Sequence, residues 1–195
     1  MEKFYELEAP KSPWGDYSRI LIAGMSCHSS RKDGLIQLER TGPYIPPISF
    51  PGIGDIVITA GFRRLLESSG LAGLRFQPVI KKHIVHLDWR AWDRAAKEPA
   101  EYPEGGEPEG YILDRPHSVQ ISDQLGDLWE VLLEESATVQ RERKPSRVLL
   151  VATSWQGADL FRAQGLLSIY TTEKTKTWFE QNAPEHVRFI DVASI

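Results

Sequence analysis

The stretch TTEKTKTWFEQNAPEHVRF (Thr171–Phe189) has the features of a helix that is followed by a strand. Its leading threonines are typical N-cap residues, and Glu173 falls in the first turn, where a negative charge suits the helix dipole. Pro184 ends the helix, because proline cannot continue the backbone hydrogen-bond ladder. With LLSIY before it and HVRFIDV after it, the stretch predicts a strand–helix–strand unit. The predicted inner face of the helix comprises Thr175, Trp178, Phe179 and Asn182.

An earlier stretch, ITAGFRRLLESSGLAGLRF (Ile58–Phe76), has the same length and ends on the same two residues. A shift of 113 positions (from 59 to 172) places Thr59 on Thr172, and it places the pair Leu65–Leu66 on the pair Trp178–Phe179. DIVI before this helix and GLRFQPV after it are typical of strands. Two copies are too few for a solenoid. The sequence therefore predicts an α+β fold, in which two related strand–helix–strand units pack on a shared core with a mixed or antiparallel sheet.

Other segments give further elements. Continuous apolar runs predict buried strands at RILIAGM (Arg19–Met25) and RVLLVAT (Arg147–Thr153), and the opening KFYELE alternates like a strand. IKKHIVHLDWRAW (Ile80–Trp92) is expected to be strand. Leucines at helical spacing predict an amphipathic helix over Ser122–Ser136, although Gly126 weakens it. The many prolines and glycines of 26–54 predict mostly loop.

The segment KEPAEYPEGGEPEG (Lys97–Gly110) contains five glutamates, three prolines and three glycines. Such a segment buries too little apolar surface to offset its ordering entropy, so we expect an exposed, mobile acidic loop. A chain of 195 residues is expected to form a single domain over 1–195. A possible subdivision of this domain is an N-terminal lobe 1–96 and a C-terminal lobe 111–195, joined by the acidic loop 97–110.

Composition excludes several classes of partner and location. A net charge of −4 argues against nucleic acid as the main partner, because nucleic-acid surfaces normally need a basic stripe. The start MEKFYELEAP lacks the apolar region of a secretory signal, and the apolar runs are too short to span a bilayer. A single cysteine, Cys27, fits a reducing compartment. We therefore expect a cytoplasmic protein with no membrane partner.

Cys27 and His28 are the first candidates for chemistry, since a thiolate beside an imidazole can act as a nucleophile. Adjacent side chains in extended backbone point to opposite faces, however, and a zinc site needs about four ligands. In HIVHLD, His86 and Asp88 share one face of the predicted strand, while His83 lies on the other. We expect no metal at either place. The alternative is an enzyme whose pocket gathers His83, His86, Asp88 and Cys27.

No other motif carries a catalytic set. GIGD (Gly52–Asp55) lacks the later residues of a phosphate loop, and no serine lies in a G-x-S-x-G elbow. Ser154 and Asp159 lie close together in SWQGADLFR, but no base stands at a recognisable offset. The sequence thus predicts no catalytic residue and no cofactor, which favours a binding protein. The large aromatic residues are expected in the core, namely Trp89, Trp92, Trp129, Trp155 and Trp178.

Three stretches together carry a family resemblance: FYELE, GMSC about twenty residues later, and the closing DLFRAQGLLSIYTTEKTKTWFEQNAPEHVRFIDV. They resemble the double-CXXCG-motif proteins of myxobacteria and their relatives, some of which are regarded as immunity partners of secreted polymorphic toxins. The chain departs from that pattern, since Ser30 stands where the first motif would have its second cysteine and Arg31 replaces the motif's glycine. The second motif is missing. Any zinc that the paired motifs bind in relatives is therefore not expected here.

The resemblance, the acidic balance and the missing catalytic set lead to one expectation. The chain is predicted to be a bacterial immunity protein that binds a cognate secreted toxin domain and occludes its active site, with no chemistry of its own. The alternatives are a small metal-dependent or histidine-based enzyme, and a non-catalytic adaptor of a secretion locus. The residues expected to bind the partner are Glu101, Glu104, Glu107, Glu109, His86 and Asp88.

Overall fold

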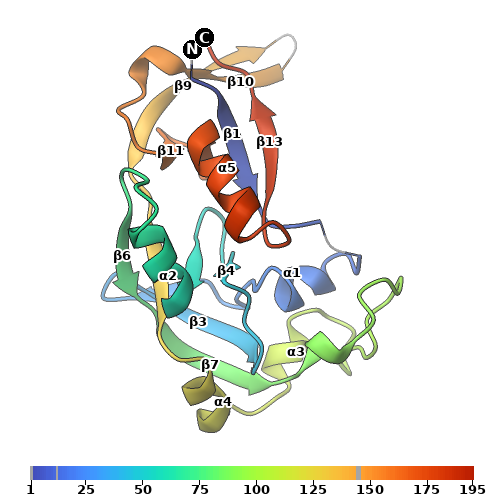
Figure 1. Cartoon of the computed structure of the whole chain (residues 1–195). Coiled ribbons are helices and arrows are strands. Elements are labelled where there is room, and N and C mark those ends of the chain that lie inside the picture. Colours follow the sequence, from blue (N-terminus) through green and yellow to red (C-terminus); the bar gives the residue numbers. More distant parts are fainter. Residues whose placement is uncertain (1, 12, 144–145) are drawn as a thin grey trace. The chain divides into compact units, whose positions relative to one another are not determined.

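The computed structural model describes residues 2–11, 13–143 and 146–195 (Figure 1). The chain forms two compact units. Unit 1 consists of Met1–Pro10, Arg63–Phe76 and Val131–Ile195, and unit 2 consists of Lys11–Phe62 and Gln77–Glu130. The acidic segment lies within unit 2, so the division does not follow the ranges 1–96 and 111–195. Helices combine with mixed and antiparallel sheets, which confirms the predicted α+β class.

Unit 1 is built on a six-stranded sheet with the order β10-β9-β11-β12-β1-β13. The first strand of the chain, β1, lies between β12 and β13 and is antiparallel to both. Strand β11 is antiparallel to β12 but parallel to β9, which makes the sheet mixed. The strands are β1 (Phe4–Glu8), β9 (Glu135–Arg143), β10 (Ser146–Val151), β11 (Leu160–Ala163), β12 (Ile169–Thr172) and β13 (Arg188–Val192).

The six-stranded sheet closes on itself through the residues that follow β13. The amide of Leu150 on β10 donates to the Ala193 carbonyl (3.0 Å), and the amide of Ile195 donates to the Leu150 carbonyl (2.9 Å). The edge strand β10 is thereby joined to the segment that continues from the opposite edge strand. Apolar side chains from several of these strands form one buried cluster, including Phe4, Ala137, Leu150, Phe161, Ala163 and Tyr170.

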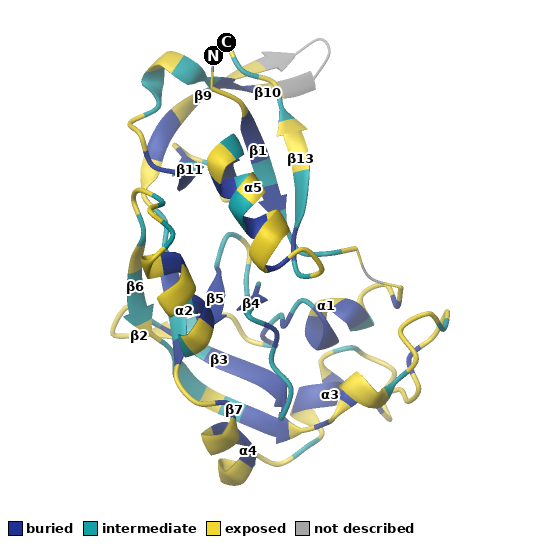
Figure 2. Ribbon diagram, viewed as in Figure 1, coloured by how far each residue is buried: buried dark blue, intermediate teal, exposed yellow. Residues whose placement is uncertain are grey.

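The C-terminal repeat copy forms the predicted strand–helix–strand unit, β12–α5–β13, with α5 at Glu173–Asn182. Thr172 is the N-cap, since its Oγ1 accepts a hydrogen bond from the Thr175 amide (3.4 Å). Helix α5 packs on β12 and β1, and it is buried on one side and exposed on the other (Figure 2). Thr175 and Phe179 are buried as expected, whereas Asn182 is exposed.

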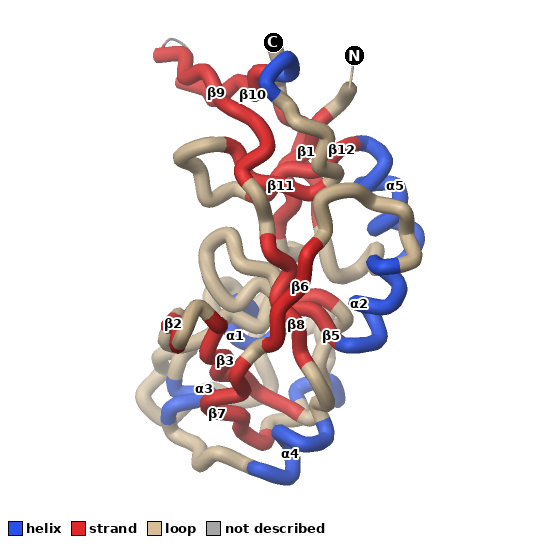
Figure 3. Tube along the Cα trace, turned by 90° about the vertical axis from the view of Figure 1, so that its left-hand side faces the viewer, coloured by secondary structure: helices blue, strands red, loops and turns tan. Residues whose placement is uncertain are grey.

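The earlier copy forms the same kind of unit, with β5 (Val57–Thr59), α2 (Ala60–Glu67) and β6 (Arg75–Pro78). It belongs to a four-stranded sheet of order β4-β5-β8-β6, in which β4 is Ile48–Ser49 and β8 is Leu128–Leu132 (Figure 3). In this copy β8 separates β5 from β6, just as β1 separates β12 from β13. Each helix therefore links two strands that flank a third strand from elsewhere in the chain.

Unit 2 also contains a three-stranded sheet, β2-β3-β7, in which the long strand β3 is parallel to β7. Its bounds are β2 (Ser30–Lys32), β3 (Leu35–Gly42) and β7 (Ile80–His86). The short helices are α1 (Tyr17–Leu21), α3 (Gly110–Leu113) and α4 (Val119–Gln124), and 3-10 turns occur at Trp89–Ala91 here and at Ala152–Ser154 in unit 1. The main buried cluster of unit 2 includes Trp14, Ile20, Leu21, Val85, Trp89 and Tyr111.

Several segments differ from the sequence predictions, and the strand expected over Ile80–Trp92 ends at His86, before the 3-10 turn Trp89–Ala91. The run Arg19–Met25 is not a strand, because α1 covers its first part, and a short apolar run fits either a buried strand or a helix. The helix over Ser122–Ser136 stops early, since Gly126 adopts a positive φ of 64° and the chain continues as β8. The region 26–54 is loop over more than half of its residues, as predicted, but it also contains β2, β3 and β4.

Neighbouring leucines on α2 provide a test of the repeat. Leu66 is 1% exposed, whereas Leu65, expected on the inner stripe, is 49% exposed. Leu66→Ala should lower the free energy of unfolding by about 2–5 kcal/mol, because it leaves a cavity. Leu65→Ala should lower it by less than about 1 kcal/mol. Urea denaturation measures both, and equal losses would contradict the burial of one face.

Candidate functional site

The acidic segment 97–110 forms an exposed loop between the 3-10 turn Trp89–Ala91 and α3. Its exposure confirms one part of the sequence prediction, whereas hydrogen bonds from Tyr111 and Tyr17 to its backbone restrict the mobility that was also expected. The carboxylates of Glu104, Glu107 and Glu109 are exposed, and none of them forms an ion pair with a described residue. Glu101 differs, because its Oε1 pairs with Arg115 Nη2 at 2.6 Å. Three of the four predicted carboxylates are therefore available, and the fourth is bound within the molecule.

Aromatic residues of the unit 2 core hold this segment at several points. The Tyr111 hydroxyl donates to the Glu101 carbonyl (2.5 Å), and the Tyr17 hydroxyl donates to the Gly106 carbonyl (2.6 Å). The rings of Tyr17 and Tyr102 pack edge to face with centroids 5.0 Å apart. Pro103 is buried. Burial raises the pKa of Tyr111, so that its hydroxyl remains a donor at neutral pH.

His86 and Asp88 lie apart from the aromatic anchors, at the end of β7 and just before the following 3-10 turn. Both are exposed, and neither side chain forms a hydrogen bond or an ion pair with any residue that the structure describes. The third residue of that motif, His83, is half-buried, and its Nε2 lies 3.0 Å from the Arg115 carbonyl. No described interaction links His86 or Asp88 to the carboxylates of the acidic segment.

Charge is distributed unequally between the two units. Unit 2 contains 15 of the 27 acidic residues but only 11 of the 23 basic residues, so it carries the whole formal net charge of −4. Unit 1 is balanced, with 12 of each. The acidic segment therefore lies on the unit that carries the negative net charge.

The Cys27–His28 motif lies beside a buried carboxylate, Glu39, which the sequence analysis did not identify as a candidate. Glu39 on β3 is 3% exposed, and its Oε2 accepts hydrogen bonds from the backbone amide and Nδ1 of His28, both at 3.0 Å. Its Oε1 pairs with Lys82 Nζ at 2.9 Å. Burial acts to raise the pKa of Glu39, but the hydrogen bonds from Lys82 and His28 outweigh it and lower that pKa. Only the fold brings these residues together.

Cys27 is not activated by this surrounding. Its Sγ lies 3.5 Å from the Glu109 carbonyl. Burial, together with the charges of Glu39 and Glu109, raises the pKa of Cys27 to about 12. A thiol in this state remains protonated at neutral pH, so it is a poor nucleophile and a poor metal ligand. Within the described residues, no group of three or more His, Cys, Asp or Glu side chains is placed to hold a metal ion.

A second polar cluster of unit 2 is centred on Arg31. Its guanidinium pairs with both carboxylate oxygens of Glu130 (2.8 and 3.0 Å) and with Asp55 (2.9 Å). Gln77 also donates to Glu130 (2.7 Å). Each member holds a different strand or turn in place, and the bidentate pair is the stronger kind of ionic contact. We assign this cluster a structural role.

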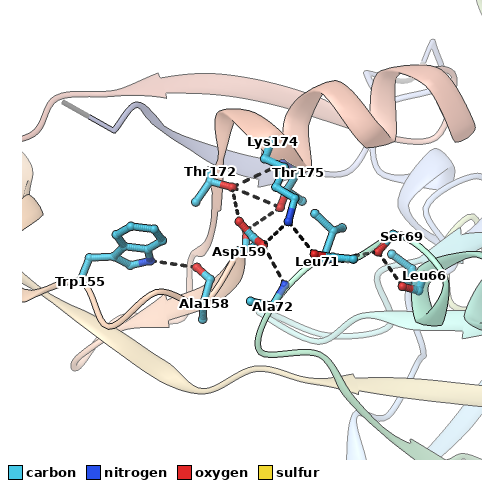
Figure 4. Close-up of polar contacts among 11 residues, drawn as sticks. Leu66, Ser69, Leu71, Ala72, Trp155, Ala158, Asp159, Thr172, Lys174 and Thr175 are labelled. Atoms are coloured by element: carbon cyan, nitrogen blue, oxygen red, sulfur yellow. Dashed lines mark hydrogen bonds and ion pairs between the residues drawn. The ribbon is translucent and has the colours of Figure 1, made fainter.

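In unit 1, Asp159 lies at the centre of a buried polar network (Figure 4). Its carboxylate accepts hydrogen bonds from the Ala72 amide (2.7 Å) and Thr172 Oγ1 (2.8 Å), and it pairs with Lys174 (3.3 Å). The nearby Ser154 Oγ is used locally, since it donates to the Val151 carbonyl (2.7 Å). This network joins segments of the fold and offers no nucleophile with a base.

A small groove of about 270 Å³ lies in unit 2 beside β7 and β8. Its one lysine, Lys81, points its Nζ at the carbonyls of Ser122 (2.5 Å) and Gly126 (3.1 Å), at the end of α4. Lys81 therefore donates hydrogen bonds to backbone carbonyls at the C-terminal end of α4. The groove is lined by Pro78, Val79, Lys81, Asp127, Leu128 and Trp129.

Comparison with known proteins gives no independent assignment. No protein-family model matches the chain, and a search of curated proteins also found no match. Among the helices that the structure describes, none has the length and apolar character needed to cross a membrane.

The raised pKa of Cys27 predicts a slow thiol. At pH 8, iodoacetamide should modify Cys27 in the folded protein at least about tenfold more slowly than in the urea-unfolded chain. Mass spectrometry of timed samples measures both rates. Equal rates would contradict the raised pKa, and a faster rate in the folded protein would mean that the thiol is activated and would revive the enzyme alternative.

The lowered pKa of Glu39 predicts a pH-dependent contribution to stability. A carboxylate with a depressed folded-state pKa stabilises the fold above its unfolded-state pKa, and the stabilisation is lost as pH falls through the folded-state pKa. Glu39→Gln should therefore cost about 1–2 kcal/mol at pH 7 and progressively less below about pH 4. Urea titrations from pH 3 to 7 measure the difference, with the exposed Glu185→Gln as a control that should show none.

Proposed function

We propose that this protein is a bacterial immunity protein, which binds a secreted toxin domain and blocks its active site without chemistry of its own. The observation that carries the proposal is the acidic segment, where Glu104, Glu107 and Glu109 are exposed and unpaired among the described residues. Their backbone is held by Tyr17 and Tyr111. The partner surface that this segment fits is basic.

Preorganisation is what makes such a segment a plausible binding surface. A flexible acidic loop would lose conformational entropy on binding, and this loss would weaken the complex. Hydrogen bonds from two buried or half-buried tyrosines and the burial of Pro103 restrict the loop before any partner arrives. The negative charge of unit 2 would also accelerate encounter with a basic surface.

The arrangement refines the roles of the predicted residues. Glu101 acts within the molecule, because its carboxylate is used by Arg115 and its carbonyl by Tyr111. Glu104, Glu107 and Glu109 are the proposed contacts. His86 and Asp88 remain secondary candidates, since they are exposed but share no described interaction with the acidic segment.

The resemblance to the double-CXXCG-motif proteins supports the same role. At the positions where that family would have a cysteine and a glycine, this chain uses polar contacts, since Ser30 Oγ accepts from Gln37 Nε2 (3.0 Å) and Arg31 pairs with Glu130. The enzyme alternative receives no support from Cys27, whose pKa is raised to about 12.

Binding can be tested with the C-terminal domain of a large secreted protein encoded beside this gene. Changing Glu104, Glu107 and Glu109 together to Gln should weaken binding by about tenfold, mostly through a slower association rate, and the loss should shrink at high salt. Surface plasmon resonance at two salt concentrations measures both effects.

The matched control changes Glu2, Glu135 and Glu185 to Gln, which removes the same charge from exposed positions of unit 1. Its affinity should stay within about twofold of the wild type. Co-expression should rescue cells from the toxin domain with the control variant, and less well with the acidic-segment variant. Equal binding by the two variants would contradict the proposed surface, and failure of the wild type to bind or rescue would contradict the function.

A further inference from the structure

Arg40 lies on β3 with its side chain fully buried, at 0% exposure. Its Nε donates to the Thr41 carbonyl (3.2 Å), and its Nη1 donates to Ser49 Oγ (2.8 Å). Its Nη2 has no hydrogen-bond acceptor within the described part of the chain. Burial lowers the pKa of Arg40 only to about 10, so the guanidinium remains charged at neutral pH. One full charge is therefore held inside unit 2 with an unused donor.

Arg40 is an exception among the buried charged side chains. A buried charge is costly unless it is paired, and removal of one partner from a buried pair destabilises the fold strongly. The other buried charged residues that the structure describes obey this rule: Glu39 pairs with Lys82 (2.9 Å), Glu130 with Arg31 (2.8 Å) and Asp159 with Lys174 (3.3 Å). No described carboxylate pairs with Arg40.

The neighbouring acid cannot supply the missing charge. Glu39 precedes Arg40 on the same strand, and successive side chains of a strand point to opposite faces. Its two carboxylate oxygens already bind Lys82 and His28. Glu39 is therefore not a counterion of Arg40.

Protein atoms of Gly24 and Ser49 pack closely around Nη1 of the guanidinium. Gly24 has a φ of +75°, and a Cβ at this position would lie 3.0 Å from Arg40 Nη1 and 3.1 Å from Ser49 Cβ. Only glycine allows the backbone to approach so closely. The unused donor capacity is accordingly on Nη2.

A second guanidinium lies beside a residue that interacts with Arg40. Tyr44 is half-buried and interacts electrostatically with Arg40. On the solvent side, the exposed Arg90 places its Cζ 5.4 Å from the centre of the Tyr44 ring. Arg90 therefore adds an exposed positive charge next to a residue that interacts with Arg40, and this charge attracts anions from solvent.

We propose that Arg40 binds a small monovalent inorganic anion, such as chloride, with Nη2 as the direct donor and Arg90 attracting the ion from solvent. The single charge matches the single buried guanidinium, whereas a divalent oxyanion would leave excess negative charge in the interior. Full burial of Arg40 favours an ion small enough to be enclosed over a carboxylate carried by another protein.

The first test is thermal unfolding at fixed ionic strength, while sodium gluconate is replaced stepwise by sodium chloride. Gluconate serves as the reference because it is a much bulkier monovalent anion than chloride. Because an ion that binds only the folded state stabilises it by mass action, Tm should rise by roughly 3 °C once chloride exceeds its Kd about tenfold. A Tm that does not depend on the choice of anion would overturn the proposal.

Variants locate the effect. Arg40→Met retains much of the side-chain volume without the charge and should lose the chloride response. Arg94→Met, at an exposed position of the same unit, should keep it. A chloride response that survives in Arg40→Met would place the ion elsewhere and overturn the assignment.

If Arg40→Met does not fold, crystals of the wild-type protein grown in sodium bromide decide the question. An anomalous bromide peak within about 3.5 Å of Arg40 Nη2 is expected, because this is the range of a hydrogen bond to the guanidinium. Well-ordered density at Arg40 without such a peak would refute the site.

Discussion

The carboxylate of Asp159 is the constraint on which the assembly of unit 1 depends. It binds the Ala72 amide, in the loop after the first repeat helix, and Thr172 Oγ1, at the start of the second. The backbone carbonyl of Asp159 also accepts from Thr175 Oγ1 (2.7 Å), inside the first turn of α5. One residue thus fixes both repeat copies to β11. Because its carboxylate is almost completely buried, the arrangement is favourable only when all the donors are in place together.

Local chemistry was sufficient to predict the repeated units but not their partner strands. The N-caps Thr59 and Thr172 could be recognised from residue type and spacing, and both accept a hydrogen bond from the amide three residues later. The strands that complete the two sheets could not be recognised in this way. The sequence of β1 indicated a strand but not which strands it pairs with. The leucine spacing of β8 indicated a helix, but pairing with β5 makes this segment a strand.

The candidate site was predictable in composition and not in geometry. The exposure of Glu104, Glu107 and Glu109 follows from a segment poor in apolar residues. The bond from Tyr17 to Gly106 joins residues far apart in the sequence, and no spacing rule indicates it. The same holds for Arg40, whose place on a buried strand was hidden in a region rich in proline and glycine. Pairings at long range decide which charges are free and which are used.

The pairing of β1 also bears on the order in which the chain can fold during its synthesis. β1 emerges first, but both of its neighbours, β12 and β13, lie near the other end of the chain. All residues of unit 2 have been synthesised once Glu130 is added. Such long-range pairing is slow and leaves a strand edge open to wrong contacts. All residues of unit 2, the acidic segment included, can therefore be present on a nascent chain whose strand β1 is still without its two neighbours.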